Sequence, residues 1–363
     1  MYPAKSSVAS LVLLLIGVAP LAAHHQDEPI RLKSDLVTLT AAVTDRNGRA
    51  IRSLKADDFV VYEDGVRQKI SHFTATEEPF VVMLLLDLSG STQDEIDLIK
   101  RSARSFLAEL RSDDRVGVIV FDSKVQVLTE ASGGPASVES AIDAIARTAA
   151  PDGQRFTSNT GTSFYDALQM ASEQSALKQT ERRKAIVCMS DGVDSTSRMS
   201  FKDAAPLIEK TQASVYFLEL NTEETTLEGL LKPRTDPGYI QFSQSQVDRY
   251  YDQYDQQSMD RFRPREVMPP LVRREVNAGL YEIARREMRS LAERAGGRVY
   301  PVSALTDLRA VYKQVAADLR AQYSISYYPE DRSRDGNWRA IKVETRAPAA
   351  TVRTRSGYWA PAR

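Results

Sequence analysis

The sequence predicts an α/β protein: a doubly wound, mostly parallel six-stranded sheet inserted in a discontinuous antiparallel β-sandwich. Residues 80–86 form a continuous apolar run, which is typical of a parallel strand covered by helices on both faces. Strand and helix patterns alternate over 79–320, which indicates a doubly wound sheet. Residues 31–76 and 323–363 instead alternate apolar and polar residues with period two, the pattern of half-buried antiparallel strands.

Composition narrows the class of protein. The chain has 363 residues, which suggests about two domains. Its 48 Lys and Arg against 49 Asp and Glu exclude a globally basic nucleic-acid binder, and we expect no nucleic-acid partner. The single cysteine, Cys188, excludes an intramolecular disulfide and a cysteine-rich zinc site. The chain has only three histidines, which makes histidine-based catalysis or metal binding a weak expectation.

Residues 1–23 have the pattern of a secretory signal peptide. Lys5 is followed by an apolar run at 11–16 and then by small residues that include Ala23. We therefore expect a secreted, periplasmic or cell-envelope protein. No later segment reaches about 18 apolar residues, so no integral membrane span is expected after cleavage. An uncleaved N-terminal anchor is the alternative.

The first β segment, 31–76, begins with a predicted strand in which Val37, Leu39, Ala41 and Val43 alternate with polar or small residues. Further on, Asp64-Gly65 lies between the segments 59–62 and 66–73, which predicts a hairpin because both turn residues tolerate positive φ.

The α/β segment, 79–320, is predicted from alternating periodicities. After the strand at 80–86, strands are expected at 115–121, 125–128, 185–190, 214–220 and 298–302. Helices are expected at 96–110, 138–147, 163–178, 201–211, 279–295 and 306–321, with a polar loop at 150–161. Residues 222–278 contain several tyrosines, glutamines and prolines without sustained periodicity, which predicts an irregular insertion. Its tyrosine and arginine content would suit a binding surface, and a segment without a specific role is the alternative.

The second β segment, 323–363, repeats the character of the first. Tyr323, Ile325 and Tyr327 alternate with serines, Asp335-Gly336 predicts a turn into a strand at 338–345, and 352–359 reads as a last strand. Isolated hairpins are marginally stable in water, so we infer that 31–76 and 323–363 pair into one sandwich. Two independent small β modules are the alternative.

Acidic and hydroxyl side chains follow two strands of the predicted sheet. Asp87, Ser89 and Ser91 come directly after the first strand, and Asp191 follows the strand at 185–190. In the strand order 3-2-1-4-5-6 these two strands are neighbours, and ligands bind outside their carboxyl ends where the order reverses. Paired carboxylates need a countercharge, and a hard divalent cation with oxygen ligands supplies one. Thr162, in the loop before the next helix, would add a hydroxyl.

At these residues the chain resembles the von Willebrand factor A-type family. That family's metal-ion-dependent adhesion site has the form Asp-x-Ser-x-Ser, a distant Thr and then a distant Asp, and all five positions are matched: Asp87, Ser89, Ser91, Thr162 and Asp191. The flanking segments DDFVVYEDGVRQKI and VRTRSGYWAP also look like those of bacterial exported proteins that carry this domain. The resemblance implies that the three hydroxyls ligate Mg²⁺, with Mn²⁺ or Ca²⁺ possible, and that the two aspartates act directly or through water. One coordination position would stay open for an Asp or Glu of a protein partner.

Catalysis is not expected. A haloacid-dehalogenase-type phosphotransferase would need a second aspartate where Ser89 stands, and no P-loop or Gly-x-Gly-x-x-Gly motif is present. We therefore predict an exported adhesion or protein-binding module. Two other classes stay open: a phosphoester hydrolase that uses the same carboxylates, and a structural envelope protein whose metal only stabilises the fold.

Overall fold

The computed structural model describes residues 36–75, 78–89, 96–148, 161–178, 182–236, 238–254 and 268–362. Asp35–Arg363 forms one compact unit, and the other unit, Met1–Ser34, lies outside the described residues together with the predicted signal peptide. None of the described helices is long and apolar enough to cross a membrane.

The central sheet has six strands. Its order is β10 (Arg298–Val302), β9 (Ser214–Leu220), β8 (Arg183–Ser190), β5 (Phe80–Asp87), β6 (Arg115–Phe121) and β7 (Val125–Thr129). All neighbours are parallel except β7, which pairs antiparallel with β6. This is the order predicted from the sequence, and it makes β5 and β8 adjacent, with Leu86 opposite Met189.

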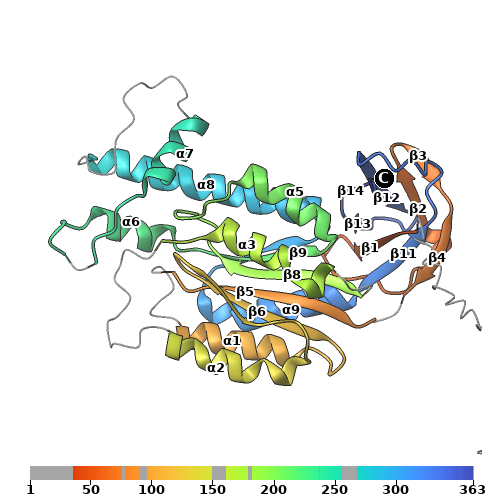
Figure 1. The fold of residues 1–363 in the computed structure, drawn as a ribbon, viewed down its shortest axis with the longest axis horizontal. Coiled ribbons are helices and arrows are strands. Elements are labelled where there is room, and N and C mark those ends of the chain that lie inside the picture. The colour runs from red at the N-terminus through yellow and green to blue at the C-terminus, as the bar shows by residue number, and fades with distance from the viewer. Residues whose placement is uncertain are drawn as a thin grey trace, which may run out of the picture. The chain divides into compact units, whose positions relative to one another are not determined.

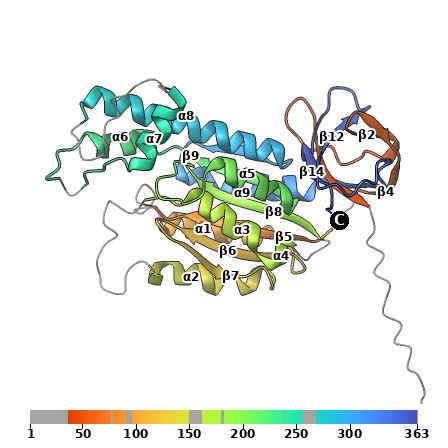
Figure 2. The same ribbon diagram turned by 45° about the horizontal axis from the view of Figure 1, so that its top comes forward.

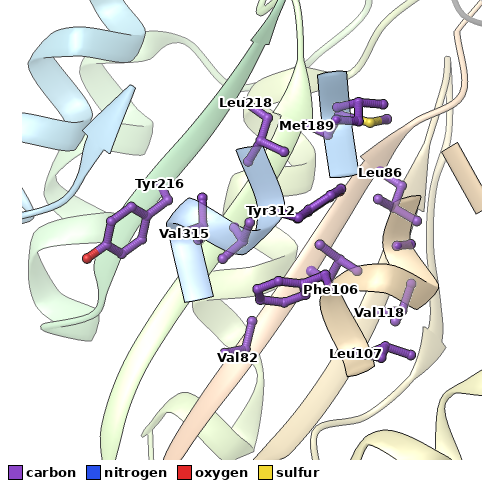
Figure 3. Packing of buried hydrophobic residues seen from close by; sticks show 14 of the residues in the cluster. Val82, Leu86, Phe106, Leu107, Val118, Met189, Tyr216, Leu218, Tyr312 and Val315 are labelled. Atoms are coloured by element: carbon purple, nitrogen blue, oxygen red, sulfur yellow. The ribbon is translucent and has the colours of Figure 1, made fainter. Parts of the chain in front are cut away.

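Helices cover both faces of this sheet, as the fully buried strand β5 requires. Alternate side chains of β5, such as Val82 and Leu86, pack with α1, α2 and α9; Figure 3 shows Phe106 of α1 and Tyr312 of α9 in this layer. Their neighbours Val81, Met83 and Leu85 pack on the other side with α3, α4, α5 and α8. The helices of the two layers are α1 (Ile96–Ala108), α2 (Glu139–Thr148), α9 (Leu308–Arg320), α3 (Phe164–Glu173), α4 (Ser175–Lys178), α5 (Phe201–Thr211) and α8 (Pro270–Arg294).

Two antiparallel sheets are built from strands on both sides of the α/β segment in the sequence. One has the order β13 (Thr351–Arg353), β1 (Val37–Thr44), β11 (Gln322–Tyr327) and β4 (Ile70–Thr74). The other has the order β14 (Gly357–Trp359), β12 (Trp338–Thr345), β2 (Phe59–Glu63) and β3 (Val66–Gln68). Both contribute to one apolar core, in which Leu39 of the first sheet joins Val61 of the second. The predicted fold class is therefore confirmed.

Two predicted strands were wrong in extent. The stretch 66–73 divides at Lys69 into β3 and β4, and the stretch 352–359 divides into β13 and β14. In each case the two pieces belong to different sheets. Packed sheets commonly make corners from strands that bend and change sheet, and a period-two pattern alone does not reveal the bend.

The prediction of an irregular insertion at 222–278 is also corrected, because the described part of this segment is largely helical. It contains α6 (Glu223–Leu231) and α7 (Gln244–Tyr254), and α8 begins at Pro270 rather than at 279. In Figures 1 and 2 α6, α7 and the start of α8 lie together. They share an apolar cluster of Leu230, Phe242, Val247, Tyr251, Met268, Val276 and Leu280.

Two physical reasons explain why these helices were not predicted from the sequence. In α7 only Val247 and Tyr251 are buried, so its apolar stripe is too narrow to give a clear periodicity. Pro269 and Pro270 mark the start of α8 rather than a loop, because a proline at the first helical position removes only an N–H that has no partner in the helix. Short 3₁₀ helices also form at Ala56–Asp58, Pro135–Ser137 and Leu305–Asp307.

Candidate metal centre

Asp87 is the last residue of β5, and its side chain is completely buried. Its Oδ1 atom accepts a hydrogen bond from the backbone N–H of Ser89 at 2.9 Å, and its Oδ2 atom accepts one from the hydroxyl of Ser190 at 2.5 Å. The Ser89 side chain also hydrogen-bonds this carboxylate. The first predicted aspartate therefore lies at the carboxyl edge of the sheet with the first predicted serine beside it.

Asp191 follows β8 directly and is also buried. Its Oδ1 atom accepts the backbone N–H of Val193 at 2.9 Å. Its Oδ2 atom accepts the hydroxyl of Thr222 and, at 3.3 Å, the hydroxyl of Tyr281. One oxygen of this carboxylate is thus held by its own loop and the other by side chains from α8 and from the start of α6.

The two carboxylates are electrostatically unfavourable neighbours. Burial, and then repulsion by Asp191, raises the pKa of Asp87 to about 7. Burial also raises the pKa of Asp191, against the opposing effect of hydrogen bonds from Thr222, Val193 and Tyr281. Such a pair is stable when it shares a proton or a cation, because two uncompensated negative charges are costly in a buried site.

Thr162 lies on the loop that leads into α3, against the loop that follows β8. Its carbonyl oxygen accepts the backbone N–H groups of Ser195 at 2.9 Å and Thr196 at 3.2 Å, and its own N–H donates to Ser195 Oγ at 2.7 Å. The loop of Thr162 is therefore fixed to the loop of Asp191. Ser91, the fifth predicted ligand, lies outside the described residues.

The donor set fits a hard divalent cation. Across the described ranges no group of three or more His, Cys, Asp or Glu side chains is placed to hold a metal. An ion at Asp87 and Asp191 would therefore take its remaining ligands from hydroxyls such as those of Ser89 and Thr162, and from water. An all-oxygen shell with several waters is the environment that Mg²⁺ prefers.

Several residues around the site were not predicted from the sequence. Thr222 and Tyr281 reach Asp191 from 31 and 90 residues away. Asp194, whose pKa burial raises to about 6, accepts the N–H of Phe164 at 2.9 Å at the start of α3. The polar run that follows β8 was a signal for Asp194 and Ser195; nothing in local spacing pointed to Thr222 or Tyr281.

Solved structures similar to the chain include three with low sequence identity. The conserved hypothetical protein BatB from Bacteroides thetaiotaomicron is 17% identical, with a TM-score of 0.41 over 66% of this chain and 98% of that one. Proximal thread matrix protein 1 from the mussel byssus, with a zinc-occupied MIDAS motif, is 14% identical, with a TM-score of 0.42 over 70% and 50%. The manganese-loaded TRAP protein of Plasmodium vivax is 18% identical, with a TM-score of 0.32 over 49% and 70%.

A search of the curated proteins finds no match. The family model of the von Willebrand factor type A domain matches residues 82–193, which begin inside β5 and end just beyond Asp191. The matched stretch thus spans both strands whose carboxyl ends carry the paired aspartates. The chain contains a von Willebrand factor type A domain.

Proposed function

We propose that this protein is an exported, metal-dependent protein-binding module. Domains of this family serve in general for adhesion and protein interaction. In this proposal Asp87, Ser89, Ser91, Thr162 and Asp191 hold one Mg²⁺ ion, with Mn²⁺ or Ca²⁺ as substitutes. The observation that carries the proposal is the buried Asp87–Asp191 pair, set beside hydroxyl donors at the carboxyl edge of the sheet.

The chemistry follows from the charges of the donor set. When bound, the ion supplies a Lewis-acidic position that accepts an external oxygen ligand. Ser89 and Thr162 contribute neutral hydroxyls, so the two aspartates are the only charged donors in the proposed set. An anionic side chain is then the partner group best suited to the remaining position. We propose an exposed Asp or Glu of a protein partner as that group.

The flanking strands belong to the same proposal. We propose that 31–76 and 323–363 form a discontinuous domain around the one at 79–320, and that residues 1–23 are removed on export. The motivating observations are the pairing of β1 with β11 and of β2 with β12, and the signal-like composition of the N-terminus. Intact-mass measurement of the protein recovered from a cell-envelope or culture fraction tests export: a chain that retains residues 1–23 contradicts it.

The main experiment is a pull-down from envelope extract in Mg²⁺ and in EDTA. Wild type is compared with Ser89→Ala and Asp191→Ala, and with Ser333→Ala and Asp331→Ala as controls. Asp331 and Ser333 are exposed, hydrogen-bond each other and are not part of the proposed ion site. We expect a partner that is retained only in Mg²⁺, lost in the two site variants and kept in both controls.

The pull-down, a melting-temperature measurement and a phosphoesterase assay on the same proteins separate the alternatives. A partner retained equally under all conditions would contradict metal-dependent capture. If EDTA lowers the melting temperature but leaves binding unchanged, the ion has only a structural role. Phosphoester turnover that is lost in Asp87→Asn would indicate a hydrolase.

A further inference from the structure

The helices at 222–294 contact the candidate metal centre directly. Thr222, at the N-terminus of α6, and Tyr281, in α8, both place their hydroxyls on Oδ2 of Asp191. Both side chains are buried, with 8% and 2% of their surface exposed. The helices are therefore part of the site's structure. Buried hydroxyls that donate to a buried carboxylate have little competition from water for these hydrogen bonds, so they hold the carboxylate in a fixed geometry.

The hydrogen bonds around Asp191 form a chain with a direction. The hydroxyl of Thr226 lies 2.8 Å from that of Tyr281, which in turn lies 2.9 Å from that of Thr222. An ionised carboxylate only accepts hydrogen bonds, so the protons of Thr222 and Tyr281 point toward Asp191. Thr226 can then donate its proton to Tyr281, so the chain runs from Thr226 through Tyr281 to Asp191. Thr222 donates to Asp191 separately, and its contact with Tyr281 carries no proton. Such a chain favours the charged carboxylate and fixes the rotation of its two oxygens.

A second set of contacts reaches the loop of Thr162. In α7, Ser245 donates its hydroxyl proton to the backbone carbonyl of Ser195 at 2.8 Å, and Ser195 is hydrogen-bonded to Thr162 on both its N–H and its hydroxyl. Arg249, one turn further along α7, hydrogen-bonds Tyr165 near the start of α3 and lies 5.2 Å from the centre of its ring. The same helical segment therefore braces the loops of both Asp191 and Thr162.

We propose that Thr222 and Tyr281 are positioning residues of the metal centre, which hold Oδ2 of Asp191 so that the carboxylate is oriented for the ion before the ion binds. This inference rests on the proposed ion site and extends it to the helical segment that begins at Thr222. In physical terms, the hydroxyl chain lowers the cost of ordering Asp191 when the cation arrives. Groups that orient a metal ligand in this way typically contribute a factor of about 10 to 100 in metal affinity.

The test is the affinity of the full chain for Mg²⁺ and Mn²⁺, measured by calorimetry well below the melting temperature. We expect Tyr281→Phe and Thr222→Val to bind each ion about tenfold more weakly than wild type or worse. Thr222→Ser retains the hydroxyl and is expected to restore binding. Valine has nearly the volume of threonine, so Thr222→Val is expected to fold. Its ion affinity therefore tests the proposal even if Tyr281→Phe does not fold.

A matched control separates positioning from general stability. Tyr300→Phe removes another buried tyrosine hydroxyl from a buried aspartate, since Tyr300 donates to Asp318 at 2.6 Å in a different part of the fold. We expect it to lower the melting temperature while leaving ion affinity unchanged. A second readout needs no ion: amide hydrogen exchange of residues 191–196 in metal-free protein is expected to rise in Thr222→Val and not in Tyr300→Phe.

The outcomes distinguish this inference from the proposed function. If wild type binds neither ion, both are overturned. If wild type binds an ion, and Tyr281→Phe and Thr222→Val bind it equally well with unchanged exchange at 191–196, only the positioning role is overturned. A loss of affinity in Tyr300→Phe as large as that in Tyr281→Phe would also overturn it, since the effect would then come from stability alone.

Discussion

Asp191 raises the pKa of Asp87, although 104 sequence positions separate the two residues, because they lie at the carboxyl ends of adjacent parallel strands in a buried site. A cation bound between them would offset the repulsion of their like charges and so stabilise the folded state. A ligand that binds only the folded state at 100 times its Kd stabilises that state by about 2.7 kcal/mol.

We therefore predict that saturating Mg²⁺ raises the Tm of the wild-type protein and that Asp87→Asn abolishes this rise. The substitution keeps the shape of the side chain and removes one of the two charges that attract the ion. Scanning calorimetry with Mg²⁺ and with EDTA provides the measurement. An equal rise in Tm for wild type and Asp87→Asn would show that the ion binds elsewhere.

The sequence was informative about this pair for a topological reason. Strand order in a doubly wound sheet follows from chain order, so Asp87 and Asp191 could be placed at one edge from the alternation of strands and helices alone. Thr222 and Tyr281 could not be placed there. Their contact with Asp191 depends on how α6 and α8 pack, and this packing is not set by any local repeat.

The β segments show the same limit. Period-two alternation identified the strands that surround Leu39 and Val61, because those side chains face a common core. It could not show that the chain changes sheet at Lys69, because alternation indicates which face of a strand is buried and not which sheet the strand joins. Likewise, the two buried side chains of α7 gave too weak a stripe for a helix to be predicted.

A buried ion pair joins the start of the α/β sheet to its last helix, and its loss should be costly. Asp114 is completely buried, accepts a hydrogen bond from Arg320 of α9 at 2.8 Å, and also accepts the backbone N–H groups of Phe80 and Arg111. We predict that Asp114→Ala lowers the free energy of unfolding by about 3–5 kcal/mol, because it leaves a largely buried guanidinium without its carboxylate.

Urea unfolding measures this loss, and an exposed pair provides the control. Lys342 and Glu344 lie 2.7 Å apart with side chains 71% and 45% exposed. Glu344→Ala should therefore cost at most about 1 kcal/mol. Similar losses for Asp114→Ala and Glu344→Ala would contradict the importance of burial.

Gly297 is expected to be indispensable for the packing of β10 on β9. A Cβ atom at this position would lie 1.8 Å from the backbone oxygen of Val215, so neither strand can stay in place. We predict that Gly297→Ala prevents folding or lowers the free energy of unfolding by several kcal/mol, on the order of the largest effects of single substitutions.

Gly65 is the matched control for Gly297. Its φ is +81°, but a Cβ atom there would meet nothing within 4 Å. Gly65→Ala should therefore cost only the strain of a left-handed backbone, about 1–2 kcal/mol. Circular dichroism and urea unfolding of both variants test this order, and a smaller loss for Gly297→Ala than for Gly65→Ala would contradict it.

Asp318 of α9 joins that helix to β10 and to β13 through a single carboxylate oxygen. Its Oδ2 atom accepts the hydroxyl of Tyr300 at 2.6 Å and the guanidinium of Arg353 at 2.7 Å. Because both charged side chains are mostly buried, Asp318→Ala should lower the free energy of unfolding by about 3 kcal/mol or more, since it leaves Arg353 without a countercharge.

The substitution Arg353→Met should likewise leave Asp318 without a countercharge. The double variant should then lose less than the sum of the two single losses, by about 0.5–3 kcal/mol. Urea unfolding of the four proteins in this cycle measures the coupling. Strict additivity would show that the Asp318–Arg353 contact does not hold α9 to the strand at Thr351–Arg353.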